Sequence, residues 1–449
     1  MTILILTFFV PLNVVADITD TKTNIIIFLV DDPGYADFGF QGSTRIKTPN
    51  IDHLANEGVR FTNGYSTGCV CTPSRAGLLT GRYPQRFGLD SNAVGKPLPT
   101  DKGPRALDSA QKTIATRLKA YGYATALFGK WHLGDEPQYL PTSHGFDEFV
   151  GVLGSGISHK KIAAQKKRGE DIFYRGQNAV PLPENPMETY CQESVSFIAR
   201  NKSKPFFLFL PFTHVHGPSV GAKPYIDAQD QNLPISVRKY LADIAETDAV
   251  VGRVMAALRE NGVEENTFVF FLGDNGGAKG NYLDNGVLRG TKWFLWEGGI
   301  RVPFLIYAKG QIQGGQVFDH PVINLDIART IFSVIDIEVD PVWKLDGADL
   351  LPILRNKNNI PPHDALFWRY GVQYAVRRGD WKLVKPSIDD RPHLYNLKTD
   401  ISETNNLALH KPEKVQELQT LWETWNNNNE PERWYDARTE GKGGNKKNN

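Results

Sequence analysis

Apolar residues occur along this chain in continuous runs, and four of these runs end in polar or charged residues. The runs span 25–30, 124–128, 206–210 and 267–272. Runs of this length are typical of strands buried on both faces, as in a mostly parallel sheet between helices. Helical periodicity fills the intervals, for example over 109–122 and 237–262. The pattern therefore predicts an α/β fold with a mostly parallel sheet.

The residues that follow the four runs are the candidates for a functional site. They are Asp31-Asp32, Gly129-Lys130-Trp131-His132, Pro211 to His216, and Gly273-Asp274-Asn275. Ligands of open α/β sheets bind outside the carboxyl ends of the strands. One such junction is common by chance, whereas four that carry carboxylates, a lysine and histidines predict one shared site.

The last quarter of the chain has a different pattern. After a linker at 356–362, short aromatic and β-branched runs at 365–371, 372–385 and 393–397 predict an antiparallel sheet, and 411–425 predicts a helix on it. We therefore expect a large domain over 17–355 and a small α+β domain over 362–437. The remaining residues, 438–449, have the composition of a disordered tail.

The first residues form an apolar run that ends at Ala16. The run is too short for a comfortable membrane span. Residues 1–16 resemble a secretory signal peptide, although they lack a basic n-region, and the alternative is a buried N-terminal strand. We expect a secreted or periplasmic protein with no integral membrane segment.

Composition and charge narrow the choice of partners. The 449 residues are 41% hydrophobic and 22% charged, which is ordinary for a soluble globular protein, and the net charge is +1. This balance indicates no nucleic-acid partner. Three cysteines cannot form a dense disulfide framework. Cys69 and Cys71 are too close for an easy bridge, and Cys191, in a helical context, is expected to be a buried structural thiol.

The acidic residues at the strand ends favour a hard cation. Asp31, Asp32, Asp274 and Asn275 offer only oxygen ligands, which suit Ca²⁺ or Mg²⁺ and suit Zn²⁺ poorly. Adjacent aspartates alone are more often structural, in turns and caps. Their place after buried strands reverses that preference.

Basic residues and histidines complete the candidate chemistry. Lys130, Lys292 and Arg75 could bind an anion beside the metal, although most such side chains are solvated surface charges. His132 and His216 are candidate acids or bases, and the alternative for each is a hydrogen-bonded structural residue. Together these groups predict the hydrolysis of a sulfate or phosphate ester.

Cys71 stands where a nucleophile belongs in this scheme. A plain thiolate is one possibility, with Arg75 four residues later. A protein-tyrosine-phosphatase loop has its arginine six residues after the cysteine and needs no metal, so the spacing and the carboxylates argue against that class.

The segment Cys71-Thr72-Pro73-Ser74-Arg75, followed by Ala76 to Arg82, resembles the signature of the type I sulfatases. In that family the cysteine is oxidised to formylglycine (3-oxoalanine). Five further segments resemble family motifs in the same order: 31–34, 129–134, 216–218, 273–276, and a late lysine block at 288–292 with 297–303. The late block departs from the family in its bulky Trp293, Phe294 and Trp296, which leave Lys292 in place and could reshape the pocket wall.

The resemblance implies a fold, a metal and a set of roles. The fold would be an alkaline-phosphatase-like α/β domain with a small C-terminal antiparallel domain. Ca²⁺, or Mg²⁺ as second choice, would be held by Asp31, Asp32, residue 71, Asp274 and Asn275. The hydrate of formylglycine 71 would attack sulfur. The other roles implied are proton acceptance by Asp274, sulfate binding by Lys130 and Lys292, proton donation by His216, deprotonation of the second hydroxyl by His132, and orientation of residue 71 by Arg75.

Two neighbouring histidines are alternatives for the proton donor. His214 lies close enough to His216 that their roles could be exchanged.

The resemblance also implies a partner, a formylglycine-generating or anaerobic sulfatase-maturating enzyme.

Three functions remain open at this point. The preferred one is a sulfatase for a sulfated carbohydrate, either an algal polysaccharide of the ulvan or carrageenan type or a glycosaminoglycan. The others are a phosphodiester or phosphonate monoester hydrolase and a catalytically silent glycan-binding protein. The basic cluster at 159–168 could bind a polyanion, or it could be a solvated face.

Overall fold

A computed structural model describes residues 22–92, 99, 101–154, 172–280, 282–356 and 360–434. The candidate signal peptide at 1–16, the basic cluster at 159–168 and the tail at 438–449 lie outside these ranges. Within them, no helix is both long enough and apolar enough to cross a membrane.

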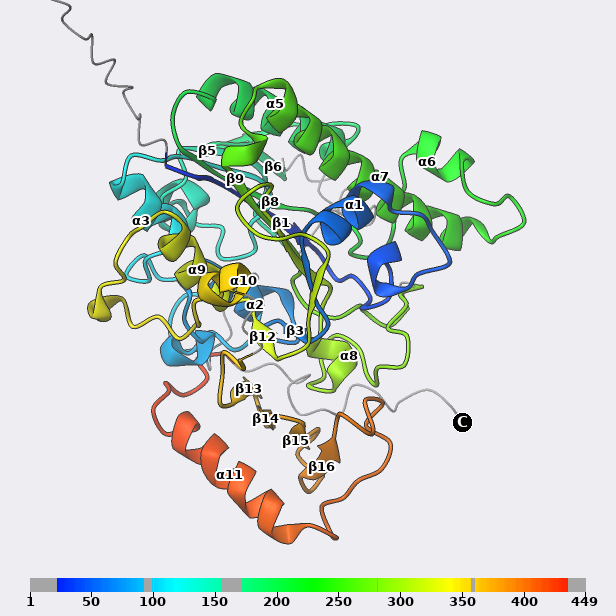
Figure 1. Cartoon of the computed structure of the whole chain (residues 1–449), viewed down its shortest axis with the longest axis vertical. Coiled ribbons are helices and arrows are strands. Elements are labelled where there is room, and N and C mark those ends of the chain that lie inside the picture. The colour runs from blue at the N-terminus through cyan, green and yellow to red at the C-terminus, as the bar shows by residue number, and fades with distance from the viewer. Residues whose placement is uncertain are drawn as a thin grey trace, which may run out of the picture.

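A mixed sheet forms the centre of the large domain (Figure 1). In the described residues it has ten strands in the order β11 (Gln316–Phe318), β2 (Val59–Phe61), β10 (Phe304–Tyr307), β9 (Thr267–Gly273), β1 (Asn24–Val30), β8 (Phe206–Pro211), β4 (Ala124–Lys130), β5 (Glu148–Val152), β6 (Phe173–Arg175) and β7 (Asn178–Val180). The five neighbours from β9 to β5 are parallel. The four predicted strands are therefore β1, β4, β8 and β9, and they lie side by side.

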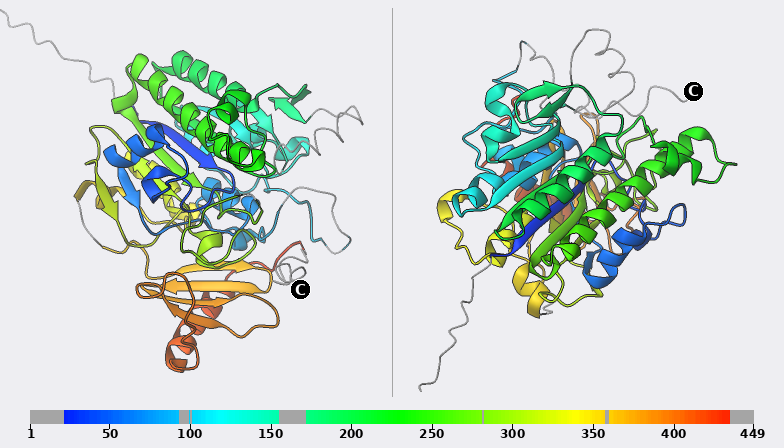
Figure 2. Two further views of the ribbon diagram at one scale, coloured as in Figure 1. Left: turned by 90° about the vertical axis from the view of Figure 1, so that its right-hand side faces the viewer. Right: turned by 90° about the horizontal axis from the view of Figure 1, so that it is seen from above.

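Helices cover both faces of this sheet (Figures 1 and 2). One face packs against α1 (Pro49–Glu57), α5 (Pro186–Asn201) and α7 (Ile235–Glu260). The other packs against α2 (Cys71–Thr80), α3 (Ile114–Ala120), α9 (Asp326–Val334) and α10 (Leu351–Asn356). Short helices α6 (Lys223–Asp227) and α8 (Glu297–Ile300) and a two-stranded sheet of β3 (Gly64–Tyr65) and β12 (Val322–Ile323) complete the domain.

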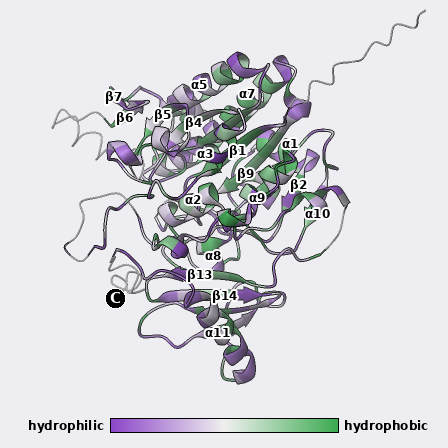
Figure 3. Cartoon of the chain, turned by 90° about the vertical axis from the view of Figure 1, so that its left-hand side faces the viewer, coloured by the Kyte–Doolittle hydropathy of each residue, from purple (hydrophilic) through white to green (hydrophobic). Residues whose placement is uncertain are grey.

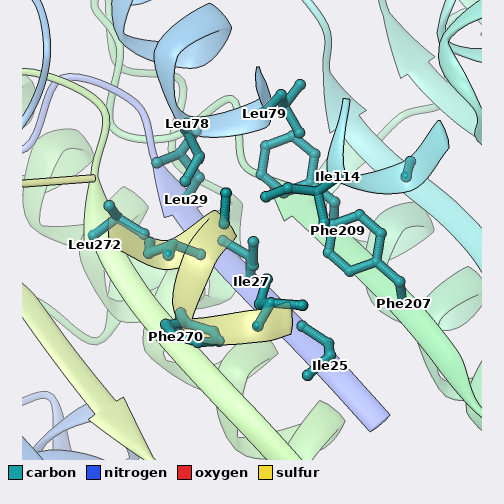
Figure 4. Close-up of a cluster of buried hydrophobic side chains, with 14 of the residues drawn as sticks. Ile25, Ile27, Leu29, Leu78, Leu79, Ile114, Phe207, Phe209, Phe270 and Leu272 are labelled. Atoms are coloured by element: carbon teal, nitrogen blue, oxygen red, sulfur yellow. The ribbon is translucent and has the colours of Figure 1, made fainter. Parts of the chain in front are cut away.

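Burial on both faces explains why the central strands are apolar throughout. Ile25, Ile27 and Leu29 of β1 point to the α2 side together with Leu78 and Leu79 of α2 (Figure 4). The alternate residues of β1 belong to the cluster on the α7 side. The central strands accordingly stand out as hydrophobic in Figure 3. The predicted α/β architecture is confirmed.

The C-terminal region forms a small separate layer (Figure 2). Its described residues make a four-stranded antiparallel sheet of β13 (Leu366–Tyr370), β14 (Gln373–Arg378), β15 (Trp381–Lys385) and β16 (His393–Asn396). Helix α11 (Pro412–Asn426) packs on the sheet, and Trp422 stacks on Tyr374 with 4.2 Å between ring centroids. The predicted sheet and helix are both present.

The bulky residues of the late lysine block join the two layers. Trp296 is buried and lies edge-on to Tyr395, at 5.9 Å between centroids. Trp293 lies 6.3 Å from the ring of Tyr370. These aromatic side chains therefore pack against the C-terminal sheet, which gives their size a structural reason.

Buried charges cross the same interface. Lys382 of β15 lies 2.9 Å from carboxylate oxygens of both Glu297 and Glu403. Burial raises the pKa of Glu403 to about 7, against the effect of Lys382. For Glu297 the positive charges of Lys382, Arg301 and Arg377 outweigh burial and lower the pKa to about 2. We call Glu297, Lys382 and Glu403 the interface triad.

Candidate active site

The predicted site residues come together at the carboxyl edge of the central sheet. Asp31 and Asp32 follow β1, Lys130 ends β4 with His132 just beyond it, and Asp274 and Asn275 follow β9. The backbone N–H of Asp32 donates to Asp274 Oδ1 at 3.0 Å, which joins the ends of β1 and β9. Cys71 and Arg75 reach the same place from α2, and Lys292 reaches it from the loop before α8.

Cys71 is the first residue of α2, and all ten residues of this helix are buried. Its Sγ lies between two lysines, 3.3 Å from Lys130 Nζ and 3.2 Å from Lys292 Nζ. Burial nevertheless raises the pKa of the Cys71 thiol to about 12, and the lysines only partly oppose this rise. The unmodified residue is therefore a neutral thiol at pH 7, which disfavours the plain-thiolate interpretation.

Arg75 lies one helical turn after Cys71 and faces the same side. Its Nε donates to Asp274 Oδ2 at 3.0 Å, and its Nη1 donates to the carbonyl of Lys130 at 2.8 Å. Both carboxylates near it, Asp274 and Asp31, raise its pKa despite burial. Arg75 thus fixes the start of α2 against the ends of β4 and β9.

The acidic residues form a compact set of ligands. One ligand atom from each of Asp31, Asp32, Cys71 and Asp274 lies within 4.8 Å of the others, and all four residues are buried. Asn275 donates through Nδ2 to Asp32 at 2.7 Å, while its Oδ1 is buried without a hydrogen-bond partner in the described part of the chain. A buried carbonyl oxygen without a donor, beside three carboxylates, fits a hard cation.

The charges of the two adjacent aspartates are balanced differently. Lys130 Nζ lies 2.7 and 2.9 Å from the oxygens of Asp31, and Lys292 Nζ lies 2.7 Å from both oxygens of Asp32. Burial raises the pKa of Asp31 to about 7, more than Lys130 lowers it. For Asp32 the nearby Lys292, His216 and Lys130 outweigh burial and hold the pKa well below its usual value.

His132 is enclosed beside the cysteine helix. Its carbonyl accepts the Thr72 hydroxyl at 2.9 Å, its φ is 63°, and its Nδ1 is buried without a partner among the described residues. Burial and the positive charge of Lys130 lower its pKa well below the ordinary value. His132 is therefore neutral at pH 7 and able to accept a proton.

The two neighbouring histidines contact different carboxylates. His216 Nε2 lies 3.5 Å from Asp32 Oδ2, whereas His214 Nε2 lies 3.0 Å from Glu246 Oε2 and 3.6 Å from Asp243 Oδ1, both on α7. Burial lowers the pKa of His216 to about 3, although Asp32 opposes this. The pKa of His214 is raised because Asp243 and Glu246 outweigh its burial. Only His216 of this pair touches the acidic cluster.

Two contributions to the site were missed from the sequence. The carbonyl of Cys69 accepts the N–H of Trp293 at 3.0 Å, which ties the residue after Lys292 to the loop before α2. Asp243 and Glu246 hold His214. Their signal was present in the sequence, because both acids fall on the apolar stripe of a helical pattern, where a charge needs a partner.

All three cysteines lie in the described ranges and are free, and Cys191 is fully buried in α5. This agrees with the expectation of a structural thiol at that position.

Comparison with known proteins decides the family. The sulfatase family model matches residues 23–337. This chain belongs to the sulfatase family. A second model, described as N-sulphoglucosamine sulphohydrolase, C-terminal, matches residues 290–430. The chain is thus a sulfatase, a hydrolase of sulfate esters.

Individual sulfatases match most of the chain. Human arylsulfatase D is 30% identical over 435 residues, which cover 80% of this chain and 72% of that protein. N-acetylgalactosamine-6-sulfatase from Mus musculus is 32% identical over 377 residues, which cover 80% and 71%. The crystal structure of Ps i-CgsB in complex with k-i-k-neocarrahexaose matches with 31% identity and a TM-score of 0.84, covering 94% of this chain and 96% of that one.

A phosphonate monoester hydrolase from Agrobacterium radiobacter shares the fold. It is 20% identical with a TM-score of 0.64, and the match covers 89% of this chain and 96% of that one. At this identity the likeness concerns the fold alone.

Proposed function

We propose that this sulfatase removes sulfate from a sulfated carbohydrate and that Cys71 is converted to formylglycine for the reaction. The observation that carries the proposal is the position of Cys71 at the start of α2, with Lys130 and Lys292 at 3.3 and 3.2 Å from its sulfur and the acidic cluster alongside. The carbohydrate assignment is supported by the neocarrahexaose complex of Ps i-CgsB and by the sulphoglucosamine family match.

The residues around position 71 can hold a sulfate ester. Lys130 and Lys292 would bind the sulfate oxygens and neutralise charge that develops on them. Formylglycine would supply a hydroxyl nucleophile as its hydrate, and Asp274, which accepts a hydrogen bond from Arg75, would accept the proton of that hydroxyl. A bound sulfate ester would also raise the pKa of His216, because a negative charge beside an imidazole favours its protonated form. His216 could then donate a proton to the leaving oxygen, and the neutral His132 could accept one.

The metal we propose is Ca²⁺, with Mg²⁺ as second choice. Asp31, Asp32, Asp274 and the Oδ1 of Asn275 would hold it together with residue 71. Bound there, the cation would stabilise negative charge on the sulfate group.

Export and maturation complete the proposal. The apolar pattern of residues 1–16 supports secretion or a periplasmic location. Conversion of Cys71 requires a formylglycine-generating or anaerobic sulfatase-maturating enzyme as partner.

The two alternative functions differ in what they require. A silent glycan-binding protein would lack a residue of the site, whereas every predicted residue is present in this chain. A phosphonate or phosphodiester hydrolase has the support of a shared fold. An assay of an aryl phosphodiester against sulfate esters would distinguish this function from a sulfatase.

A substrate panel tests the proposal. Protein made together with a maturating enzyme should release sulfate from at least one of ulvan, carrageenan, fucoidan or heparan fragments, and Cys71→Ser should fold and release none. Peptide mass spectrometry should find formylglycine at position 71 in the active protein. Faster cleavage of an aryl phosphodiester than of any sulfate ester, or full activity with an intact thiol, would contradict the proposal.

Metal content can be measured independently of activity. Purified protein should contain calcium, and exhaustive chelation should lower its melting temperature as well as its activity, because a ligand that binds only the folded state stabilises it. Asp31→Asn should retain less metal than the wild-type protein. An unchanged melting temperature after chelation would argue against the metal site.

A further inference from the structure

A second cavity adjoins the sulfate site and has no part in the roles described above. It has a volume of about 130 Å³ and lies between the start of α5, the loop after β8 and the first half of α7. We call it the α5–α7 cavity. His216 lines it and also contacts Asp32 of the acidic cluster at 3.5 Å. The cavity therefore begins beside the residue proposed to protonate the leaving oxygen, which is where the rest of the substrate must lie.

Part of the lining of the cavity is apolar. It consists of Leu182, Pro186, Met187, Val220 and Ala222. Such side chains cannot bind a charged group, but they can pack against the C–H face of a ring.

Besides the exposed Glu184, two carboxylates of α7 line the cavity. Asp243 and Glu246 are three residues apart on α7 and so project from the same side of the helix. Both are buried, with exposures of 1% and 3%. The cavity therefore combines an apolar surface with strong hydrogen-bond acceptors.

The two carboxylates differ in how far they are already paired. Glu246 accepts from Asn185 Nδ2 at 2.5 Å and from His214 Nε2 at 3.0 Å. Asp243 Oδ1 accepts the backbone N–H of Gly221 at 2.8 Å, and the Ser219 side chain also hydrogen-bonds to this carboxylate. Its Oδ2 is buried and has no hydrogen-bond partner within the described ranges. A buried carboxylate oxygen left unpaired is costly, so a donor from outside the chain is expected to fill this position.

We propose that the α5–α7 cavity binds the neutral ring of the sugar that carries the scissile sulfate, and that one hydroxyl of this ring donates to Asp243 Oδ2. The inference rests on the proposed carbohydrate function. A second sulfate or a carboxylate on the ring would meet Asp243 and Glu246, whose negative charge repels it. The cavity therefore selects a free hydroxyl at the position that faces α7.

The test uses monosaccharide sulfates of galactose, fucose, N-acetylgalactosamine and glucosamine, with 4-nitrophenyl sulfate as a substrate that has no sugar hydroxyl. In Asp243→Asn the Oδ1 can still accept from Gly221, but an NH₂ group replaces the free acceptor. The ratio of kcat/KM on the best sugar sulfate to kcat/KM on the aryl sulfate should fall by about 10- to 100-fold, as expected for the loss of a hydrogen bond to a charged group. The loss should lie mainly in KM, because the contact is made before and during the reaction.

Asp248→Asn provides the matched control. Asp248 is a buried carboxylate on the same helix, but it caps the backbone of Asn50 and Ile51 and does not line the cavity. Its substitution should change the substrate ratio by no more than about twofold if the proposal holds. A similar fall in both variants would assign the effect to the helix and overturn the proposal.

Deoxy analogues of the best sugar sulfate test the same contact in the wild-type protein, which matters if Asp243→Asn does not fold. At one ring position, replacement of the hydroxyl by hydrogen or by fluorine should lower kcat/KM by about 10- to 100-fold, as the variant does. Neither substituent can donate a hydrogen bond. Equal activity of all deoxy analogues would overturn the proposal.

If the wild-type protein cleaves aryl sulfate but no sugar sulfate, the proposed function fails and this inference fails with it. If the protein cleaves a sugar sulfate and Asp243→Asn leaves the ratio of the two kcat/KM values unchanged, this inference is refuted and the proposed function stands.

Discussion

Two histidines two residues apart have different surroundings, and this difference separates their proposed roles. His216 faces Asp32 of the acidic cluster, whereas His214 is held by Glu246 and Asp243 of α7. A group that donates a proton to the leaving oxygen must lie beside the reacting atoms. His214 is instead placed to orient the carboxylates that line the α5–α7 cavity.

The comparison of two substrates separates these roles. His216→Ala should lower kcat on a carbohydrate sulfate by about 10²- to 10⁴-fold, the usual range for a lost general acid, and should affect an aryl sulfate much less, since a phenolate leaves without help. His214→Ala serves as the control and should raise KM on the carbohydrate while leaving most of kcat. A large loss of kcat in His214→Ala instead would assign the proton transfer to the other histidine.

At the scale of elements, the close approach of β4 and β8 positions Lys130. Gly129 has a φ of 142°, and a Cβ atom at this position would lie 2.0 Å from the carbonyl oxygen of Pro211. Only glycine allows the two strands to approach in this way. The backbone at Gly129 therefore fixes the position of Lys130, the last residue of β4.

Gly129→Ala should destabilise the protein by more than about 3 kcal/mol, because backbone strain is added to a clash with a neighbouring strand. It should also lower activity on aryl sulfate by moving Lys130. Gly122→Ala is the matched control, since its φ of 85° is also positive but nothing lies within 4 Å of the added Cβ. Urea unfolding should give a cost of about 1 kcal/mol for the control. Equal costs for the two variants would show that the close approach is unimportant.

The elements that the sequence predicted correctly are those with a strong pattern. The strands β1, β4, β8 and β9 are apolar throughout because helices cover both faces. The strands β2, β3 and β12 contain two or three residues, too few to show a period. The predicted residues at the ends of the long strands lie together in the structure. Asp243 was missed because its partners become visible only when α7 packs beside the loop after β8.

At the scale of the whole molecule, the two domains share a buried interface that contains charge. Glu297 and Glu403 are 106 residues apart and meet through the backbone N–H of Glu297 and through Lys382. No periodicity in the sequence could pair these three residues, since the pairing depends on how the domains pack. The interface triad therefore links the stability of one domain to that of the other.

Lys382→Met should destabilise the protein by about 3–5 kcal/mol, because it leaves two buried carboxylates without their shared cation. Lys385→Met, on the same strand but only partly buried, should cost less than about 1 kcal/mol. Urea unfolding followed by tryptophan fluorescence provides the comparison. Similar small costs for both variants would show that the triad contributes little.

The pKa of Glu403 predicts a pH dependence of stability. The pKa is raised from an ordinary value of 4.5 to about 7 in the folded chain. The folded state thus holds a proton that the unfolded state has already lost, and the contribution of this group to stability is lost as pH rises from 4.5 through 7. In Glu403→Gln the free energy of unfolding should therefore fall less between pH 5 and pH 8 than it does in the wild-type protein. The opposite order of the two slopes would contradict the assignment.

The burial of Cys71 bears on whether its modification comes before or after folding. The side chain is 1% exposed, and every residue of the helix it begins is enclosed. The enzyme that we propose to oxidise this side chain would have to contact it, and the folded molecule does not expose it. Oxidation would therefore have to come before the chain closes around α2. Fast folding would then compete with modification, and newly made chains that close too early would stay inactive for as long as they remain folded.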